Sequence, residues 1–535
     1  MPENHWRLQV TRRGLAPLSA LLPEAAGATN DLDDWLDRED IPDGVPYLIS
    51  PDLEYDIDLN RYFLRSALVG ASRNTQLAAA RDIRRFLDFL WCARGGLGWR
   101  EAAEADHDAY WYWRRQDPAG PRVAGSTWNR ELSMLNGFYA WAARRGMVTE
   151  SPVAQRRRRP SPAATSQGHA GAGELTAAAQ ARDARRDLVE WLTPAQYRSW
   201  RDTGLRGYDA LGLPGRRFRG RWAARNALFA DLMVRTGMRL TEQGSLTALE
   251  IPRSGGGQAY HRFWLPAAIA KGGSARWVYM PDGIARRIGE YIATDRADVI
   301  EQARARGAYD RIASPLIIED PGARRPCVTV RGQAGSAARV PVEQLEPHER
   351  ARLLVRAADG LEPAALWLGE HGLPITVSGW KQVFAAANER CVRAGVAVLC
   401  HPHLLRHSFA VVTLEQLQRG HLADLAAMTA EQRGHYAKIF GDPLDWVRRR
   451  LGHSSIASTL IYLHALQELE MRTRMTLVPD DWDAPPAGEP GAGEAREGTR
   501  AHRSRQVVGS PARPVLCPRA CPARRGRVRG LVHGR

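Results

Sequence analysis

The sequence predicts a mainly α-helical protein with a small β-hairpin, which is an α+β fold. Apolar residues recur at helical spacing through residues 59–153 and again through residues 225–235. Two strand-like runs, 261–265 and 276–280, stand on either side of a Lys-Gly-Gly turn. A stretch rich in Pro, Arg, Gly and Ala follows residue 152 and separates these regions, so we expect more than one domain.

The composition suits packed cores and excludes a membrane span. The chain has 535 residues, 44% of them hydrophobic, and lacks an apolar run of the roughly 18 residues that a membrane helix needs. Its first residues do not follow a signal-peptide pattern, so we expect a cytoplasmic protein. Scattered cysteines predict reduced thiols rather than a disulfide framework: Cys92, Cys327, Cys391, Cys400, Cys517 and Cys521.

The charge favours a nucleic-acid partner without establishing one. The formal net charge is +16 and the pI is near 10.0. Almost all of the basic residues are arginine, a bias that also follows from a GC-rich coding sequence. Lysine occurs only at Lys271, Lys381 and Lys438, which makes Lys271, in the predicted hairpin turn, conspicuous.

The first half of the chain divides into three parts. Residues 1–58 form a lead-in of unclear role, with an acidic patch at 31–40, which is solvated or packs on the next domain. Residues 59–153 form a small helical domain whose last helix is capped by Ser126 or Thr127. Residues 154–187 form a basic, flexible linker.

A second domain is expected over residues 188–475. Thr193 and Pro194 have the residue types of an N-cap and a first helical position. Residues 304–362 are charged and lack clean periodicity, and residues 419–442 add length between Arg406 and His453; both intervals are interpreted as surface insertions. Residues 476–535 are rich in Arg, Pro and Gly and predict a disordered tail.

The most informative stretch begins at Cys400. A helix starting at Pro402 would place His403 and Arg406 on one face, with His407 one turn beyond His403. About fifty residues on, Leu-Gly-His reads as a helix ending at Gly452, after which a serine caps a new helix that carries Tyr462.

A metal site is the rival interpretation of this stretch, because Cys400, His401, His403 and His407 are all ligand types. A zinc-protease helix, however, needs Glu between its histidines, where this chain has Leu404. The cation of Arg406 would also repel a metal ion, whereas its planar fork fits phosphate oxygens. The sequence therefore predicts a phosphate site with no metal and no cofactor.

These motifs resemble those of the tyrosine recombinases, also called the phage integrase family. The C-terminal signature is His-Leu-Leu-Arg-His from His403, then Leu-Gly-His ending at His453, then Tyr462. Upstream stand Thr-Gly-Met-Arg-Leu-Thr-Glu, which contains Arg239 and Glu242, and the hairpin that carries Lys271. The resemblance implies a helical core-binding domain and a mixed catalytic domain that form a clamp around DNA.

The resemblance also implies a role for each residue in a site-specific recombinase that works through a 3′-phosphotyrosine. Arg239 and Arg406 hold the phosphate, His453 adds a hydrogen bond and Tyr462 is the nucleophile. His403 accepts the tyrosine proton, Lys271 is the general acid and Glu242 supports Arg239, while His407 and His464 are open between packing and assisting roles. The expected DNA contacts are Arg73, Arg84, Arg85, Arg130, Arg156, Arg157, Arg158, Arg159 and Arg276.

The partners implied are double-stranded DNA at a specific attachment site, further copies of the chain forming a tetramer on that DNA, and an accessory directionality factor. We expect no membrane partner, a nucleoid-associated location, and an integrase of a phage or mobile element. Four alternatives stay open: a type IB topoisomerase, a telomere resolvase, a non-catalytic DNA-binding relative and a metal-dependent hydrolase.

Overall fold

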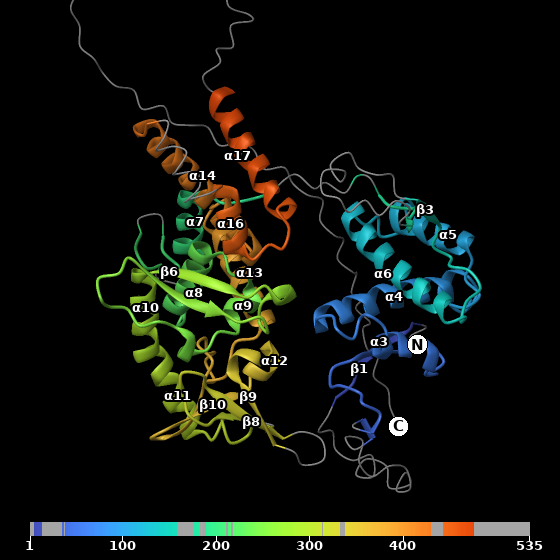
Figure 1. Cartoon of the computed structure of the whole chain (residues 1–535), viewed down its shortest axis with the longest axis horizontal. Coiled ribbons are helices and arrows are strands. Elements are labelled where there is room, and N and C mark those ends of the chain that lie inside the picture. The colour runs from blue at the N-terminus through green and yellow to red at the C-terminus, as the bar shows by residue number, and fades with distance from the viewer. Residues whose placement is uncertain are drawn as a thin grey trace, which may run out of the picture. The chain divides into compact units, whose positions relative to one another are not determined.

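The computed structural model describes residues 5–12, 35–36, 38–157, 175–181, 183, 189–209, 212–215, 218–312, 314–331, 337–429 and 442–475. Helices dominate and the sheets are small, which confirms the predicted α+β class (Figure 1). Most of the acidic patch in 31–40, the arginines Arg158 and Arg159, and the predicted tail 476–535 lie outside the described residues. No helix in the described ranges combines the length and apolar character of a membrane span.

The first helical region forms where the spacing predicted it. It contains α3 (Ile57–Arg65), α4 (Arg73–Ala93), α5 (Glu104–Arg115) and α6 (Gly125–Arg144). Asp56 and Ser72 cap α3 and α4 with their side chains. The caps expected for α6, Ser126 and Thr127, are wrong, because Ala124 has the extended backbone of an N-cap and the helix begins directly after it.

Part of the predicted lead-in packs on these helices. Strand β1 (Arg7–Val10) pairs antiparallel with β2 (Pro46–Ile49). Leu48 is fully buried, and its backbone N–H and C=O both bond the buried side chain of Asn60 on α3, at 2.7 and 2.9 Å. The described residues of this segment therefore belong to the same hydrophobic core as the helices.

The flexible linker predicted over 154–187 is wrong for two of its segments. Strand β3 (Gln155–Arg157) pairs with β4 (Leu175–Ala177). Beyond β4, the indole of Trp128 donates to the carbonyl of Ala179 at 2.7 Å, and Asn129 exchanges two hydrogen bonds with the backbone of Ala181. Small alanine side chains let this backbone approach α6, and its polar groups are satisfied by side chains of that helix.

The second region is built around a buried aromatic core. Its elements in chain order are α7 (Pro194–Trp200), a π-turn (Arg201–Leu205), α8 (Ala223–Thr236), α9 (Leu240–Gly244), β5 (Tyr260–Leu265), β6 (Arg276–Pro281), α10 (Asp282–Ala293), α11 (Asp295–Ala305), α13 (Val377–Arg393), α14 (Pro402–Ala427), α16 (Pro443–Leu451) and α17 (Ala457–Met475). Thr193 caps α7 and Pro194 is its first residue, as predicted. Phe229 stacks on Trp380 with ring centroids 3.5 Å apart, and Trp367 meets both rings.

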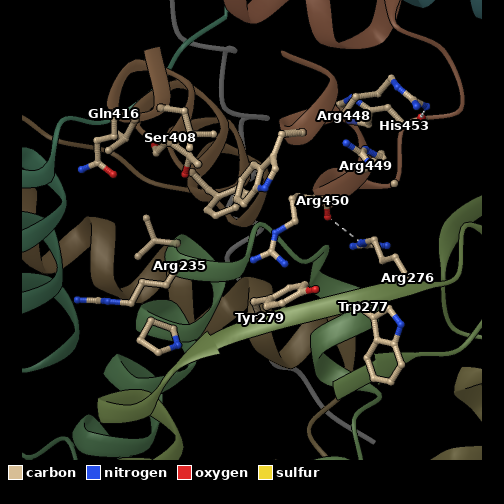
Figure 2. Close-up of a pocket in the computed structure, with 18 of the residues that line it drawn as sticks. Arg235, Arg276, Trp277, Tyr279, Ser408, Gln416, Arg448, Arg449, Arg450 and His453 are labelled. Carbon is tan, nitrogen blue, oxygen red and sulfur yellow. Dashed lines mark hydrogen bonds between the residues drawn. The ribbon is translucent and has the colours of Figure 1, made fainter. Parts of the chain in front are cut away.

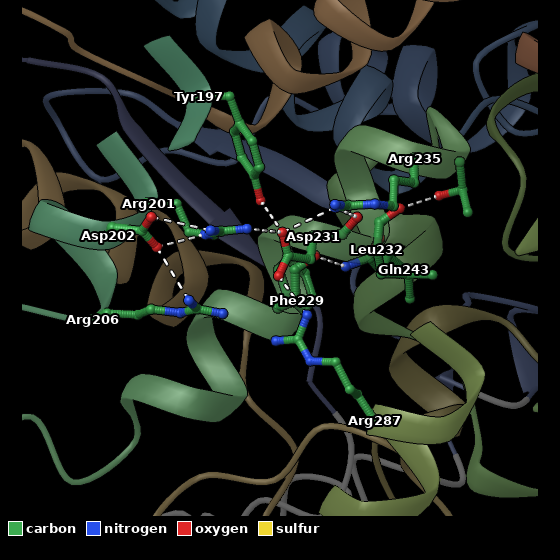
Figure 3. Close-up of polar contacts among 11 residues, drawn as sticks. Tyr197, Arg201, Asp202, Arg206, Phe229, Asp231, Leu232, Arg235, Gln243 and Arg287 are labelled. Atoms are coloured by element: carbon green, nitrogen blue, oxygen red, sulfur yellow. Dashed lines mark hydrogen bonds and ion pairs between the residues drawn. The ribbon is translucent and has the colours of Figure 1, made fainter. Parts of the chain in front are cut away.

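A buried carboxylate braces α8, the helix that leads to Arg239. Asp231 has no exposed surface and accepts hydrogen bonds from Tyr197 at 2.8 Å and from Arg201, Arg235 and Arg287 at 2.8 to 3.0 Å (Figure 3). Burial alone would raise the pKa of Asp231, but the three arginines hold it at about 2. The network ties α7, the π-turn and α10 to α8.

The predicted insertion at 304–362 is a folded sheet rather than an irregular segment. Its strands are β7 (Leu316–Ile318), β8 (Cys327–Arg331), β9 (Ala337–Pro341), β10 (Leu353–Ala357) and β11 (Gly360–Pro363), in the order β11-β10-β7-β8-β9. The sheet has its own core, and α12 (Pro347–Arg350) carries a buried Arg350 that pairs with Glu250 at 2.9 Å. Strands of three to five residues are too short to show a period in the sequence. Of the second insertion, 419–427 continue α14, and 430–441 lie outside the described residues.

Candidate active site

Arg239 is positioned by a glycine turn at the end of α8. Gly237 has φ +66°, in the left-handed region, and its N–H closes the helix on the carbonyl of Met233. A Cβ at this position would lie 2.4 Å from the ring of Phe409 on α14 and 2.9 Å from Leu451 on α16. Glycine therefore lets α8, α14 and α16 meet, and the chain then turns into α9 with Arg239 as its extended N-cap.

Glu242 holds two arginines beside this turn. Its side chain is 1% exposed and accepts from the Arg239 N–H at 2.9 Å, from the Arg239 guanidinium at 2.8 Å and from Arg276 Nη2 at 2.6 Å. Burial alone would raise the pKa of Glu242, but Arg276 and Arg239 lower it to about 2. At neutral pH the carboxylate is therefore an anion that orients both guanidinium groups.

The placement of Arg276 corrects the expectation that it contacts DNA. Strand β6 alternates buried and exposed residues, and Arg276 lies on its buried face. Its guanidinium bonds Glu242 and, through Nε, the carbonyl of Arg450 at 2.9 Å, the contact dashed in Figure 2. Arg276 thus ties the hairpin to α9 and α16, with its guanidinium bonded to protein groups at the edge of a groove.

Arg406 lies on α14 with 1% of its surface exposed. Nη1 donates to the carbonyl of Gly237 at 2.5 Å and Nη2 to that of Leu451 at 2.6 Å, so both helix ends contribute to its orientation. Burial lowers the pKa of Arg406 to about 9, and the neighbouring charges of Arg239 and Arg276 act in the same direction. A buried guanidinium that lies close to other cations favours the binding of an anion.

Tyr462 on α17 is buried and lies close enough to Arg406 to feel its charge. Its hydroxyl lies 3.1 Å from Nδ1 of His407, and its ring is parallel to that of His453 at an interplanar angle of 14°. Burial raises the pKa of Tyr462, while the charges of Arg406 and Arg239 oppose that rise. Sequence reasoning paired the hydroxyl with His403, but the structure puts His407 in that position.

The signal that could have selected His407 was helical spacing. His403 and His407 are one turn apart on α14, and their ring centroids are 4.3 Å apart. His403 is exposed, whereas His407 is only partly exposed and reaches toward α17. The sequence shows the shared face, but not which end of that face α17 covers.

His453 follows the C-cap of α16, as predicted. Gly452 has φ +66°, and His453 Nδ1 lies 3.0 Å from the hydroxyl of the buried Thr459. Burial lowers the pKa of His453 to about 3, helped by the charge of Arg406, so the ring is neutral. A neutral imidazole with one nitrogen held by Thr459 keeps the other for a hydrogen bond to a ligand.

Lys271 is exposed at the tip between β5 and β6. The turn has positive φ at Gly272 and Gly273, +66° and +67°, and no atom outside the local chain within 4 Å of a Cβ at either position. The pKa of His403 is lowered by partial desolvation and then by nearby positive groups, among which is Lys271. The lysine is thus close enough to the site to act on its charges and has open space around its turn.

A groove runs beside these residues. Its volume is about 1520 Å³, and among the described residues its lining contains arginines and aromatic rings but neither Asp nor Glu. Figure 2 shows Tyr279 on β6 beside Arg450, with Trp277 further along the same strand. The guanidinium of Arg450 lies 3.8 Å from the ring centre of Tyr279 and 4.8 Å from that of Trp446. The groove suits a polyanion.

Three of the arginines expected to contact DNA, Arg84, Arg85 and Arg130, have ion-pair partners in the first region. Arg85 and Arg130 lie 2.8 and 2.9 Å from the buried Asp82, and Arg84 lies 3.7 Å from Asp88. Arg73 is exposed, Arg156 bonds Gln180, and Arg157 lies on β3. The Arg130–Asp82 pair could not be read from the sequence, because α4 carries Asp82 and α6 carries Arg130, whereas the other two pairs have i,i+3 and i,i+4 spacing within α4.

The donors considered for a metal do not converge. The thiol of Cys400 is 1% exposed, and burial raises its pKa. His401 Nδ1 accepts the N–H of Leu404 at 3.2 Å. Within the described residues, no three side chains of His, Cys, Asp or Glu lie close enough together to hold a metal ion.

Comparisons with known proteins agree with the motifs. Residues 60–146 match the phage integrase N-terminal SAM-like domain. The chain is 23% identical over 405 residues to tyrosine recombinase XerC of Lactobacillus delbrueckii subsp. bulgaricus, which covers 75% of this chain and 92% of that protein. It is 30% identical over 181 residues to tyrosine recombinase XerD of Mycobacterium tuberculosis, and the match covers 32% of this chain and 49% of that protein. A structure of the Tn1549 transposon integrase aligns with a TM-score of 0.41 at 15% identity, covering 78% of this chain and 98% of that chain.

The SAM-like domain match covers the first helical region, and the match to XerC extends over most of both proteins. The motif residues that carried the resemblance lie in the second region, where the ends of α8, α14, α16 and α17 bring them together. The chain is therefore similar to the tyrosine recombinases in both regions.

Proposed function

We propose that this protein is a site-specific DNA recombinase that cleaves and rejoins strands through a 3′-phosphotyrosine intermediate. The observation that carries the proposal is that Arg406 donates to the carbonyls of Gly237 and Leu451, which lie two residues before Arg239 and His453, so that motifs from distant segments meet. The charge of Arg239 acts on Arg406 and on Tyr462, and Arg406 acts on Tyr462 in turn. An anionic group seated between these two guanidinium groups would lie beside the tyrosine hydroxyl.

The phosphodiester is the anion that this arrangement fits. Arg239 and Arg406 hold the two non-bridging oxygens, and His453 adds a hydrogen bond. The charge that develops in the transition state then meets donors already oriented by Glu242, Gly237 and Leu451. Bound phosphate would also add negative charge beside Arg406, whose pKa burial and the charge of Arg239 lower.

Tyr462 attacks phosphorus and Lys271 protonates the departing 5′-oxygen. The product is a 3′-phosphotyrosine link and a free 5′-hydroxyl. Exchanging one phosphodiester for another is nearly isoenergetic, so the cycle as proposed uses neither ATP nor a metal. The opposite attack by a 5′-hydroxyl rejoins the strand.

DNA binding is proposed to involve both regions, which close around the duplex as a clamp. The proposed phosphate contacts are the exposed Arg73, Arg130 and Arg156, the half-buried Arg84 and Arg85, and Arg157, Arg158 and Arg159; the buried Arg276 is left out of that set. We further propose an attachment site as target, a tetramer on DNA, an accessory directionality factor and a role in a phage or mobile element. The protein would then be associated with the nucleoid.

The test is a covalent adduct. The target is first recovered from a pool of random duplexes with the Tyr462→Phe protein, whose ring keeps its packing but has no hydroxyl to attack. A nicked duplex of the recovered sequence should trap the wild-type protein as a slowly migrating adduct in denaturing gels, in EDTA, and should not trap Tyr462→Phe. Equal trapping of the two proteins would remove Tyr462 from the nucleophile's role.

Relaxation of supercoiled plasmid separates the alternative enzymes. A recombinase should leave a plasmid that lacks the recovered sequence supercoiled. Complete relaxation of such a plasmid would instead assign a type IB topoisomerase activity to the same tyrosine.

A further inference from the structure

His407 occupies a position that the proposed reaction leaves without a role. Its Nδ1 lies 3.1 Å from the Tyr462 hydroxyl, and its ring centroid lies 5.7 Å from that of the tyrosine. Among the hydrogen bonds between described residues, this is the contact that the hydroxyl makes. A phenol that is 1% exposed needs such a partner, because a buried O–H without an acceptor costs free energy.

We propose that His407 accepts the proton of Tyr462 when the tyrosine attacks DNA. The proposal rests on the recombinase function above and assigns to His407 the step that the resemblance assigned to His403. Since Nδ1 already contacts the reacting oxygen, the proton moves along an existing hydrogen bond.

The two histidines of α14 have different surroundings. His403 is exposed and lies among the cations that would surround the phosphate, Arg406, Arg239 and Lys271. His407 is one turn further along α14 and partly buried against α17. His403 therefore faces the substrate, and His407 faces the nucleophile.

The surroundings keep His407 neutral and ready to accept. Burial lowers the pKa of His407 to about 4, and the nearby charges of His403, Arg406 and His401 act in the same direction. The group that faces it from α17 is the Tyr462 hydroxyl itself. Bound phosphate adds negative charge to this cluster, which makes the imidazolium form less costly at the moment of attack.

The step balances without a further reactant. The bond from Tyr462 Oη to phosphorus forms as the Oη–H proton passes to His407 Nδ1. The bond from phosphorus to the 5′-oxygen breaks, and Lys271 supplies the proton for that oxygen. In the rejoining reaction each proton returns to the group that released it.

The experiment isolates the tyrosine proton. The recovered duplex is made with sulfur in place of the bridging 5′-oxygen at the cleavage position, so that the leaving group departs without a proton. The rate of adduct formation is measured between pH 7 and 9 for wild type, His407→Asn, His407→Phe and His403→Asn. Asn keeps an acceptor oxygen near the position of Nδ1 but takes no proton, whereas Phe keeps the ring volume alone. His464→Asn, at an exposed position on α17, is the matched control.

We expect the wild-type rate to be nearly independent of pH in this range. Both His407 variants should be slower at pH 7 by about 100-fold or more, the usual size of general-base catalysis. Their rates should then rise about tenfold for each pH unit, because the reaction now waits for tyrosinate. His464→Asn should behave as wild type, and duplex affinity should be unchanged in all variants. Thermal melting should fall only in His407→Phe, which leaves the buried Tyr462 hydroxyl without an acceptor.

Several outcomes would overturn the role of His407. One is a wild-type rate and flat profile in both His407 variants. Another is a wild-type rate for His407→Asn alone, which would mean that His407 only positions the Tyr462 hydroxyl. If His403→Asn acquires the pH dependence instead, then His403 is the proton acceptor. A wild-type protein that binds the duplex and forms no adduct would refute the recombinase function itself, a result distinct from the other three.

Discussion

Arg276 Nη2 lies 2.6 Å from Glu242 Oε2, so a buried ion pair joins the hairpin that carries Lys271 to the helix that begins at Arg239. The same arginine donates from Nε to the carbonyl of Arg450, at the end of α16. Residues from three separate parts of the sequence are thereby held at one place. The catalytic arrangement depends on this pair as much as on the residues that would touch DNA.

Glu242→Gln should destabilise the protein and disturb Arg239. Removing one partner of a buried ion pair leaves uncompensated charge and costs about 3–5 kcal/mol. Chemical denaturation should show this loss at pH 7. Glu290→Gln, which alters an exposed pair with Arg286 at 3.9 Å, should change stability by less than about 1 kcal/mol. Equal effects of the two substitutions would contradict the role of Glu242.

The same carboxylate gives a pH dependence of stability. The pKa of Glu242 is about 2 in the folded protein, below the ordinary 4.5, so its contribution is fully present above pH 4.5 and is lost as pH falls toward 2. The difference in unfolding free energy between wild type and Glu242→Gln should therefore shrink by about 3 kcal/mol across that window. A difference that stays constant from pH 5 to pH 2.5 would show that Glu242 is not held as an anion.

Gly237→Ala should be costly for two separate reasons. Its φ of +66° disfavours any side chain, and the added Cβ would press on Phe409 and Leu451. Strain and overpacking together predict a loss of about 2–4 kcal/mol, measured by denaturation. Gly256→Ala is the matched control, because φ is +73° there but nothing lies within 4 Å of the new Cβ. It should lose only the strain, about 1–2 kcal/mol; an equal loss at both sites would mean that the helix contacts at Gly237 contribute nothing.

Lys271→Ala should slow cleavage of an ordinary duplex, and a bridging sulfur in the substrate should restore the rate. On an ordinary nicked duplex the variant lacks the general acid, so adduct formation should fall by about 100-fold or more. On the duplex with bridging sulfur the departing thiolate needs no proton, and the variant should approach the wild-type rate. Lys381→Ala, also exposed, should match wild type on both substrates. A Lys271→Ala defect of the same size on both substrates would assign the lysine to another role.

Arg130→Ala should weaken DNA binding without selecting among sequences. If Arg130 neutralises a phosphate, the slope of log affinity against log salt should fall by about 1, and related and unrelated duplexes should be affected alike. Affinity is measured from 50 to 200 mM salt, with Arg286→Ala on α10 as an exposed control. An unchanged slope would show that Arg130, 2.9 Å from the buried Asp82, serves the fold rather than the DNA.

Local structure was largely predictable from the sequence, because its signals are short-range. Pro402 and Pro443 open helices, Gly237 and Gly452 end them in the left-handed conformation, and Thr193 caps α7. These features depend on sterics and hydrogen bonds within a few residues. The candidate catalytic residues were found by the same kind of signal, since their motifs are local strings.

Tertiary structure alone decided which of these residues touch. The sequence could not show that Arg276 turns inward to Glu242, because both faces of a short hairpin carry aromatic and basic residues. Nor could it show that segment 175–181 returns to α6, or that residues 316–363 form a sheet, since those pairings join backbone groups far apart in the chain. The choice of His407 over His403 has the same cause. Spacing on α14 places both histidines on one face, and only the packing of α17 against α14 brings the Tyr462 hydroxyl to one of them.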